Sequence, residues 1–115
     1  MTTQEKRKHY RVDSLNLLSY TCLDEEGNFV KHGMGRTLNV SESGLLLETH
    51  IELEPQHAIL LTIGLEEDLV EIRAQVMHSK MGPEGKVESG IHFFEMDEPA
   101  KVVLTKYIKA FEAQQ

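Results

Sequence analysis

Apolar and polar positions alternate along most of the chain, which is the pattern of strands that bury one face. The clearest case is LVEIRAQVMHSK, in which every second residue from Val70 to Val76 is apolar and the residues between them are charged or polar. LNLLSYTC alternates in the same way, with Leu18, Tyr20 and Cys22 on one face. These segments therefore predict β-strands with one face in a core and the other face toward solvent.

Polar or glycine-containing turns separate the apolar runs. DEEGN and MGPEG each connect two runs as expected for antiparallel hairpins. HIELEPQ looks like a longer connection, because Pro55 resists regular pairing. The predicted strands cover residues 15–22, 29–40, 44–49, 58–64, 69–80 and 86–94. Six short strands at this spacing suggest a small antiparallel barrel or sandwich.

The apolar period lengthens near the end of the chain, from two residues to that of a helix. Leu104, Tyr107, Ile108 and Phe111 recur at helical spacing and mark one apolar stripe. Pro99 suits a first helical turn, and the two acidic residues before it suit the positive end of a helix dipole. The pattern thus predicts a β-barrel with a C-terminal helix that covers one opening or one side.

Size and composition indicate one ordinary domain. The chain has 115 residues, of which 40% are hydrophobic and 27% are charged, so wholesale disorder is not expected. No apolar run approaches the roughly 20 residues that span a bilayer, and the N-terminus has no apolar segment of the signal-peptide kind. Cys22 is the single cysteine, which excludes an internal disulfide framework. We therefore expect a cytoplasmic protein.

The charges are distributed unevenly. The formal net charge is -7, yet Lys6, Arg7, Lys8 and Arg11 make the first 11 residues basic, with only Glu5 against them. The remaining residues include 8 basic and 18 acidic side chains, which makes general binding to DNA or RNA unfavourable. Composition alone favours a solvated tail for the basic segment.

Other common site chemistries find little support. The six histidines, His9, His32, His50, His57, His78 and His92, are scattered over separate predicted elements without metal-ligand spacing. SESG lacks the form of a nucleophile elbow, and GMG opens a strand where a dinucleotide loop would open a helix. No metal, no cofactor and no catalytic residue is predicted, and we do not expect an enzyme.

Two short stretches combine a motif form with a defined place among the predicted elements. EKRKHYRV, just before the first strand, contains Arg7 and Arg11 in the form R-x-x-x-R. NVSESG, in the turn between the second and third strands, contains Asn39, Ser41 and Gly44 in the form N-x-S-x-x-G. Each is weak alone, because Asn, Ser and Gly are ordinary turn formers. Their order and spacing together are more informative.

With both motifs in these positions, the chain resembles the PilZ domain, a bacterial receptor module for the second messenger cyclic di-GMP. Such domains have R-x-x-x-R just before the first strand and [D/N]-x-S-x-x-G between the second and third. GIHF, Gly90–Phe93, is similar to the G-h-x-F of the family's last barrel strand, and Lys6 stands where many members have a second arginine. The resemblance covers nearly the whole chain. It implies an all-β fold, a six-stranded antiparallel PilZ-type β-barrel with a C-terminal α-helix.

The resemblance also implies a division of labour within the single domain. Residues 1–13 would form a basic ligand-binding arm, and residues 14–115 would form the barrel with its helix. The implied ligand for the site is cyclic di-GMP. The implied ligand-binding residues are Arg7, Arg11, Asn39, Ser41 and Gly44, and the secondary candidates are Lys6, Lys8, Arg36 and His78.

These residue types suit such a ligand. Guanidinium pairs bidentately with phosphate or with guanine O6 and N7, and it stacks on bases. Residues four apart in an extended arm lie about 13 Å apart, so the two arginines would reach different parts of a ligand. Asn39 and Ser41 lie two apart and should emerge on one face, while Val40 points into the barrel. Gly44 permits either an unusual turn conformation or close backbone approach to the ligand.

The resemblance further implies a signalling role. The arm is expected to lack fixed structure without ligand and to become ordered across the barrel face when cyclic di-GMP binds. An unidentified downstream protein would recognise this surface, whereas DNA, RNA and direct membrane insertion are not expected. The alternative is a PilZ-like adaptor that binds partners without nucleotide. A barrel that binds single-stranded nucleic acid is disfavoured by the aromatic content of 6% and the acidic body.

Overall fold

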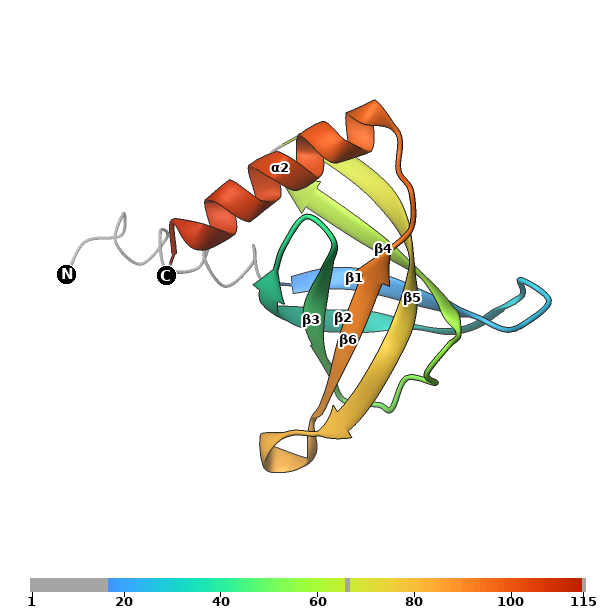
Figure 1. Cartoon of the computed structure of the whole chain (residues 1–115). Helices are drawn as coiled ribbons and strands as arrows, with labels where there is room; N and C mark the ends of the chain where they lie inside the picture. Colours follow the sequence, from blue (N-terminus) through green and yellow to red (C-terminus); the bar gives the residue numbers. More distant parts are fainter. Residues whose placement is uncertain (1–16, 66, 115) are drawn as a thin grey trace.

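The computed structural model describes residues 17–65 and 67–114, which form a closed barrel with one long helix beside it (Figure 1). All neighbouring strands are antiparallel, and their order around the barrel is β1-β2-β3-β6-β5-β4. The elements are β1 (Leu17–Leu23), β2 (Phe29–Val40), β3 (Gly44–Thr49), β4 (Ala58–Leu65), β5 (Asp68–Met81), the short 3-10 turn η1 (Pro83–Gly85), β6 (Val87–Phe93) and α2 (Glu98–Glu112).

The predicted fold class is confirmed, and the predicted strands agree closely with the observed ones. The bounds of β2 and β3 are those expected from the sequence, β4 differs from expectation by one residue at its end, and β5 and β6 each differ by one residue at both ends. The observed β1 begins at Leu17, and the two residues predicted before it lie outside the described part of the chain. The basic arm, residues 1–13, also lies outside it.

Alternation along the strands builds the core as the sequence predicts. Leu18, Tyr20 and Cys22 of β1 are buried, and the apolar set of β5 closes the far side of the same interior. Each fully buried leucine or isoleucine contributes about 1.5–3 kcal/mol relative to an exposed one. The core side chains with no exposed surface are Leu47, Leu53, Ile59, Leu61, Ile63 and Ala74. Burial of this one face fixes the pairing register, because a one-residue slip would expose it.

Helix α2 packs on β4 and β5 and lies over one end of the barrel (Figure 1). Its N-cap is Asp97, whose side chain accepts a hydrogen bond from the Ala100 backbone N–H at 3.0 Å. Tyr107 lies on the buried stripe and donates a hydrogen bond from its hydroxyl to Thr37 Oγ1 of β2 at 2.9 Å. Burial raises the pKa of Tyr107 above its ordinary value of 10.0. The helix is therefore attached to β2 through the barrel interior.

Three irregularities interrupt the ladder, and the sequence pattern predicted none of them. One lies in β1, between Cys22 and Leu23, and the other two flank the β3–β6 pair. The register shifts in β2 between Thr37 and Asn39, and it shifts in β5 between Val76 and His78. Each is a β-bulge, which bends a strand and redirects the side chains beside it. Both bulges lie next to the β3–β6 pair, and this arrangement shapes the outer surface there.

Candidate functional site

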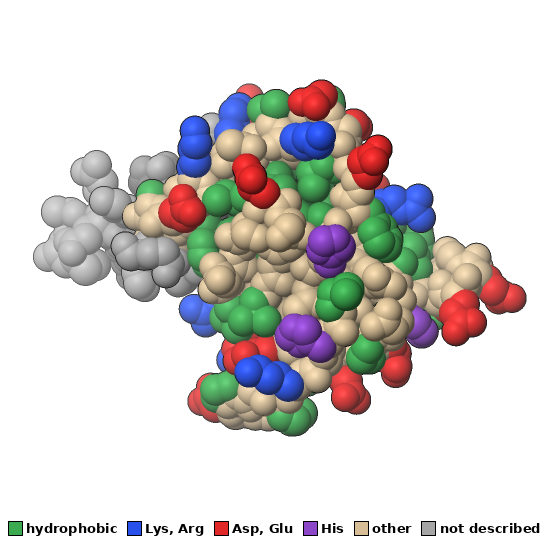
Figure 2. All heavy atoms as spheres, in the orientation of Figure 1, with side chains coloured by type: hydrophobic (Ala, Val, Ile, Leu, Met, Phe, Trp, Pro, Cys, Tyr) green, Lys and Arg blue, Asp and Glu red, His purple; other side chains and the backbone are tan. Residues whose placement is uncertain are grey.

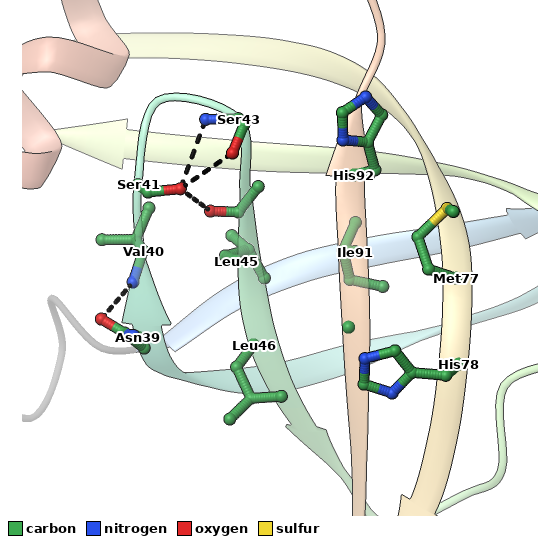
Figure 3. Close-up of a pocket in the computed structure, with 12 residues that line it drawn as sticks. Asn39, Val40, Ser41, Ser43, Leu45, Leu46, Met77, His78, Ile91 and His92 are labelled. Atoms are coloured by element: carbon green, nitrogen blue, oxygen red, sulfur yellow. Dashed lines mark hydrogen bonds between the residues drawn. The ribbon is translucent and has the colours of Figure 1, made fainter.

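A hollow of about 330 Å³ lies on the outer face of the barrel, between the two bulged strands. Its floor comes from β3 and β6, one side comes from the turn between β2 and β3, and the other side comes from β5 (Figure 3). The residues that line it are Asn39, Val40, Ser41, Ser43, Gly44, Leu45, Leu46, Met77, His78, Gly90, Ile91 and His92.

Strand pairing places four of these residues in one row across the hollow. Asn39 of β2 pairs with Leu46 of β3, Leu46 pairs with Gly90 of β6, and Gly90 pairs with His78 of β5. The row thus joins an amide on one side to an imidazole on the other, over a floor of one leucine and one glycine. A ligand placed across these strands would contact residues as far apart in the sequence as Asn39 and Gly90, which lie in one row only because the barrel is closed.

The turn between β2 and β3 is held by its own hydroxyl and backbone groups. The Ser41 backbone N–H donates to the Gly44 carbonyl at 2.8 Å, and Ser41 Oγ lies 3.3 Å from the same carbonyl. Ser41 Oγ also accepts from the Ser43 backbone N–H at 3.3 Å and lies 3.2 Å from Ser43 Oγ (Figure 3). Serine forms such local bonds readily. Its hydroxyl therefore fixes the shape of the turn.

Position 44 requires a glycine, because the backbone of β6 lies too close for a side chain. A β-carbon at this position would lie 2.1 Å from the carbonyl oxygen of Ile91 and 3.3 Å from the Cα of His92, both in the backbone of β6. No ordinary side chain fits there without movement of the strand. Of the two explanations expected for this glycine, the structure shows a close approach, but the neighbour is β6.

Asn39 lies near the end of β2, just before the turn, and lines the hollow. Its side-chain oxygen accepts a hydrogen bond from the Val40 backbone N–H at 3.0 Å, which holds the amide at the end of β2. Val40 is buried, as predicted, while Asn39 and Ser41 are exposed. The bulge before Asn39 directs its side chain toward the hollow. Amide and hydroxyl groups at this rim are able both to donate and to accept hydrogen bonds.

The β5 side of the hollow has a different construction. Met77 and His78 are consecutive and both exposed, because the bulge inserts an extra residue into the alternation. The imidazole of His78 lies against Gly90, where a β-carbon would come within 2.4 Å of Nε2. Figure 3 shows the ring of His78 directed toward β6, with Met77 between it and His92.

The electrostatic character of the hollow differs from that of the whole chain. The chain has 19 acidic residues, but none of the 12 residues that line the hollow is acidic. Two of the 12 are histidines, and in Figure 2 uncharged atoms lie between the histidine side chains at the centre of this face. An anionic ligand would therefore meet neutral dipoles and imidazoles here, despite the net charge of -7.

Metal and nucleophile chemistry find no support in the part of the chain that the structure describes. No group of three or more His, Cys, Asp and Glu side chains converges there as a metal site would require. Cys22 is buried, and burial raises the pKa of its thiol above 9.0, which disfavours the reactive thiolate. The helix in residues 17–65 and 67–114 is too short and too polar to cross a membrane.

A comparison with protein-family models matches residues 5–110 to the PilZ domain. The chain belongs to the PilZ domain family. The match covers most of the chain, including both motif stretches. PilZ domains are receptor or adaptor modules and are not typically enzymes. A comparison with curated proteins gave no match.

Solved structures with the same fold include three PilZ-type proteins. The chain is similar to the Bacillus subtilis inhibitor of motility MotI/DgrA, with a TM-score of 0.61 and 18% identity over 86% of this chain and 48% of that one. It is similar to the PilZ domain of CeSA from a cellulose-synthesizing bacterium, with a TM-score of 0.57 and 10% identity over 84% of this chain and 93% of that one. It is also similar to the c-di-GMP-dependent transcription regulatory factor MrkH, with a TM-score of 0.56 and 11% identity over 85% of this chain and 47% of that one. At these identities the likeness concerns the fold.

The relative lengths also differ. This PilZ domain spans about half the length of MotI/DgrA and of MrkH, and nearly the whole of the CeSA domain. The shared part is thus the barrel with its helix, and the two longer proteins have further segments beside it.

The structure brings together four of the predicted site residues, namely Asn39, Ser41, Gly44 and His78. Arg36 is exposed on β2 opposite Glu48 of β3 and does not line the hollow, and its role in ligand binding stays a prediction. The remaining candidates, Lys6, Arg7, Lys8 and Arg11, lie outside the described residues.

Sequence reasoning gave no role to several residues that line the hollow. The motif form N-x-S-x-x-G leaves Ser43 as a variable position, and His92 is one of the six scattered histidines. GIHF contains both Gly90 and His92, and its alternation with buried Ile91 was the available signal that they share the outer face. Their position beside Gly44 and His78 depends on the pairing of β6 with β3 and β5.

Proposed function

We propose that this PilZ domain is a receptor for cyclic di-GMP and that it relays the bound state to a partner protein. The observation that supports this most directly is the hollow itself. Asn39, Ser41 and Gly44, the three fixed positions of N-x-S-x-x-G, lie together at its edge, in a chain that also has R-x-x-x-R ahead of β1. The similar structure of MrkH, a c-di-GMP-dependent transcription regulatory factor, adds support at the level of the family.

In this proposal the two motifs do different work. Arg7 and Arg11 supply guanidinium groups, which pair with phosphate or the guanine edge and stack on bases. Asn39 supplies an amide for the base edge or the sugar-phosphate ring, and Ser41 maintains the turn that places this amide. Lys6 and Lys8 add attraction for an anion but lack the planar fork.

The uncharged lining of the hollow fits a dianionic ligand. A carboxylate beside a bound phosphate would oppose binding, and none of the lining residues has one. Binding would hold residues 1–13 across the hollow and create a composite surface of arm and ligand. A downstream protein would recognise that surface, in the cytoplasmic location expected from the sequence.

Calorimetric titration tests the proposal. The 115-residue chain is titrated with cyclic di-GMP, and cyclic di-AMP and GTP serve as control ligands. The variants Arg7→Ala and Arg11→Ala should each weaken binding about tenfold to a hundredfold, because a hydrogen bond to a charged group contributes about 1.5–3 kcal/mol. Circular dichroism should show an unchanged fold in both variants.

Two results would contradict the proposal. Unchanged affinity in both arginine variants would remove the arm from the site. Absence of binding by the wild-type chain would favour the alternative, a PilZ-like adaptor that works without nucleotide.

A further inference from the structure

The β5 side of the hollow contains features that neither motif explains. The register shift between Val76 and His78 leaves Met77 and His78 exposed in succession. These are the two residues of β5 that line the hollow, across from the turn between β2 and β3. β-Bulges are common next to binding sites, where they redirect a side chain. The fold of the barrel does not require an imidazole at this position, since His78 is exposed and lies outside the buried core.

The place of the imidazole is set by Gly90. A β-carbon on Gly90 would lie 2.4, 2.8 and 3.0 Å from Nε2, Cε1 and Cδ2 of His78. The ring therefore occupies space that any other residue at position 90 would fill, and it lies over β6 inside the hollow. An aromatic ring held over a glycine, with its outer side open, is a surface on which a flat base stacks.

The distance across the hollow indicates which part of a ligand this ring meets. The row from Asn39 through Leu46 to Gly90 crosses two strand spacings, which amount to about 10 Å. One hydrogen-bonding group does not reach both ends of such a row. A ligand that contacts Asn39 with one polar group must present a second element over Gly90, with Leu46 as the apolar floor between them.

We infer that His78 is a ligand-contacting residue, and that its imidazole stacks on a purine base while Asn39 bonds to another part of the same ligand. This inference rests on the proposed function and deepens it. It assigns the recognition of the ligand to three strands, β2, β5 and β6, where the motifs alone assign it to the arm and one turn. The class of ligand that fits is a cyclic dinucleotide with a purine base.

The test compares three variants of the full chain in titrations with cyclic di-GMP. His78→Ala removes the ring and should weaken binding about tenfold to a hundredfold, the usual effect when a base loses an aromatic partner. His78→Phe keeps a flat ring and should retain affinity within a few-fold. His50→Ala is the matched control, because His50 is an exposed histidine that does not line the hollow.

A fourth variant tests the position of the ring and leaves residue 78 a histidine. Gly90→Ala introduces a methyl group where His78 Nε2 now lies, so the imidazole must move. We expect a loss of affinity similar to that of His78→Ala, with thermal unfolding to confirm the fold. Ring-proton shifts of His78 by NMR on addition of cyclic di-GMP provide a direct readout that a purely structural role would not produce.

The outcomes separate this inference from the function on which it rests. If the wild-type chain binds and depends on Arg7 and Arg11 while His78→Ala binds equally well, His78 has no role and the receptor function stands. If His78→Phe loses as much affinity as His78→Ala, stacking is wrong. If the wild-type chain does not bind cyclic di-GMP, both proposals are wrong.

Discussion

The two sides of the hollow are built by opposite means. On the β2–β3 side, the turn is held by backbone and hydroxyl bonds, and Gly44 lies so close to β6 that no β-carbon fits. On the β5 side, an extra residue in the strand presents Met77 and His78 to solvent, and no hydrogen bond holds either side chain within the part of the chain that the structure describes. One side is shaped by backbone contacts, and the other is shaped by exposed side chains.

This difference separates support of the fold from contact with a ligand, two roles that a binding motif usually combines. A residue on the β2–β3 side contributes to the fold as well as to any ligand, so its substitution changes both. Met77 and His78, the two β5 residues that line the hollow, contribute little to stability, so their substitution should change binding alone. Four substitutions test this difference between the two sides through their effects on the free energy of unfolding.

Gly44→Ala should have the largest effect. The new methyl group would lie 2.1 Å from the Ile91 carbonyl oxygen, and a backbone atom cannot rotate away as a side chain does. We expect a loss of about 3 kcal/mol, the upper end of the usual cost of overpacking. Urea denaturation measures it.

The control for this variant is Glu42→Ala, in the same turn but exposed. It should change stability by less than about 0.5 kcal/mol. Equal stability of Gly44→Ala and the control would show that the close approach to β6 does not constrain the turn.

Tyr107→Phe should have the second-largest effect. The variant leaves the hydroxyl of Thr37, a buried residue just before the β2 bulge, without its 2.9 Å hydrogen bond. We expect a loss of about 1–2 kcal/mol, the usual cost of a buried polar group that loses its partner. Thermal unfolding of Tyr107→Phe, Thr37→Val and the double variant forms a cycle, and additive losses would contradict direct coupling between helix and bulge.

Ser79→Ala tests the corresponding support on the other side. Ser79 follows His78 directly and is within hydrogen-bonding distance of two groups, Ser89 Oγ at 2.8 Å and the Leu53 carbonyl at 3.0 Å. We expect a loss of about 1 kcal/mol, because the variant takes this partner from both the Ser89 hydroxyl and the Leu53 carbonyl at a partly buried site. A larger loss than that of Tyr107→Phe, measured in the same denaturant series, would reverse the order of the two sides.

Met77→Ala should have the smallest effect. The side chain is 45% exposed on the outside of the barrel, and the bulge does not depend on it for a hydrogen bond. Stability should change by less than about 0.5 kcal/mol. A loss above 1.5 kcal/mol, by the same measurement, would show that the β5 side is also structural and would end the distinction between the two sides.

The regular parts of this PilZ domain were predictable from the sequence because burial follows the alternation of side chains. Val70 to Val76 shows this, as does the cap at Asp97. The bulges were not predictable, because a register shift depends on which strand lies beside the bulged one. The same limit applies to His92, whose partner Gly44 is 48 residues earlier in the chain. Local patterns predict strands, whereas the site arises from contacts between distant strands.

Closure of the barrel also restricts how a partner is able to bind. An open sheet offers an unpaired strand edge, to which another protein adds a strand through backbone hydrogen bonds. In the described barrel each of the six strands has a neighbour on both sides, but Phe29–Gly35 of β2 pair with β1 alone and Asp68–Arg73 of β5 pair with β4 alone. Backbone addition of this kind is therefore restricted to such segments. At the hollow, by contrast, β3 pairs with both β2 and β6, and β6 pairs with both β3 and β5, so a molecule bound there would meet side chains and not an unpaired strand edge.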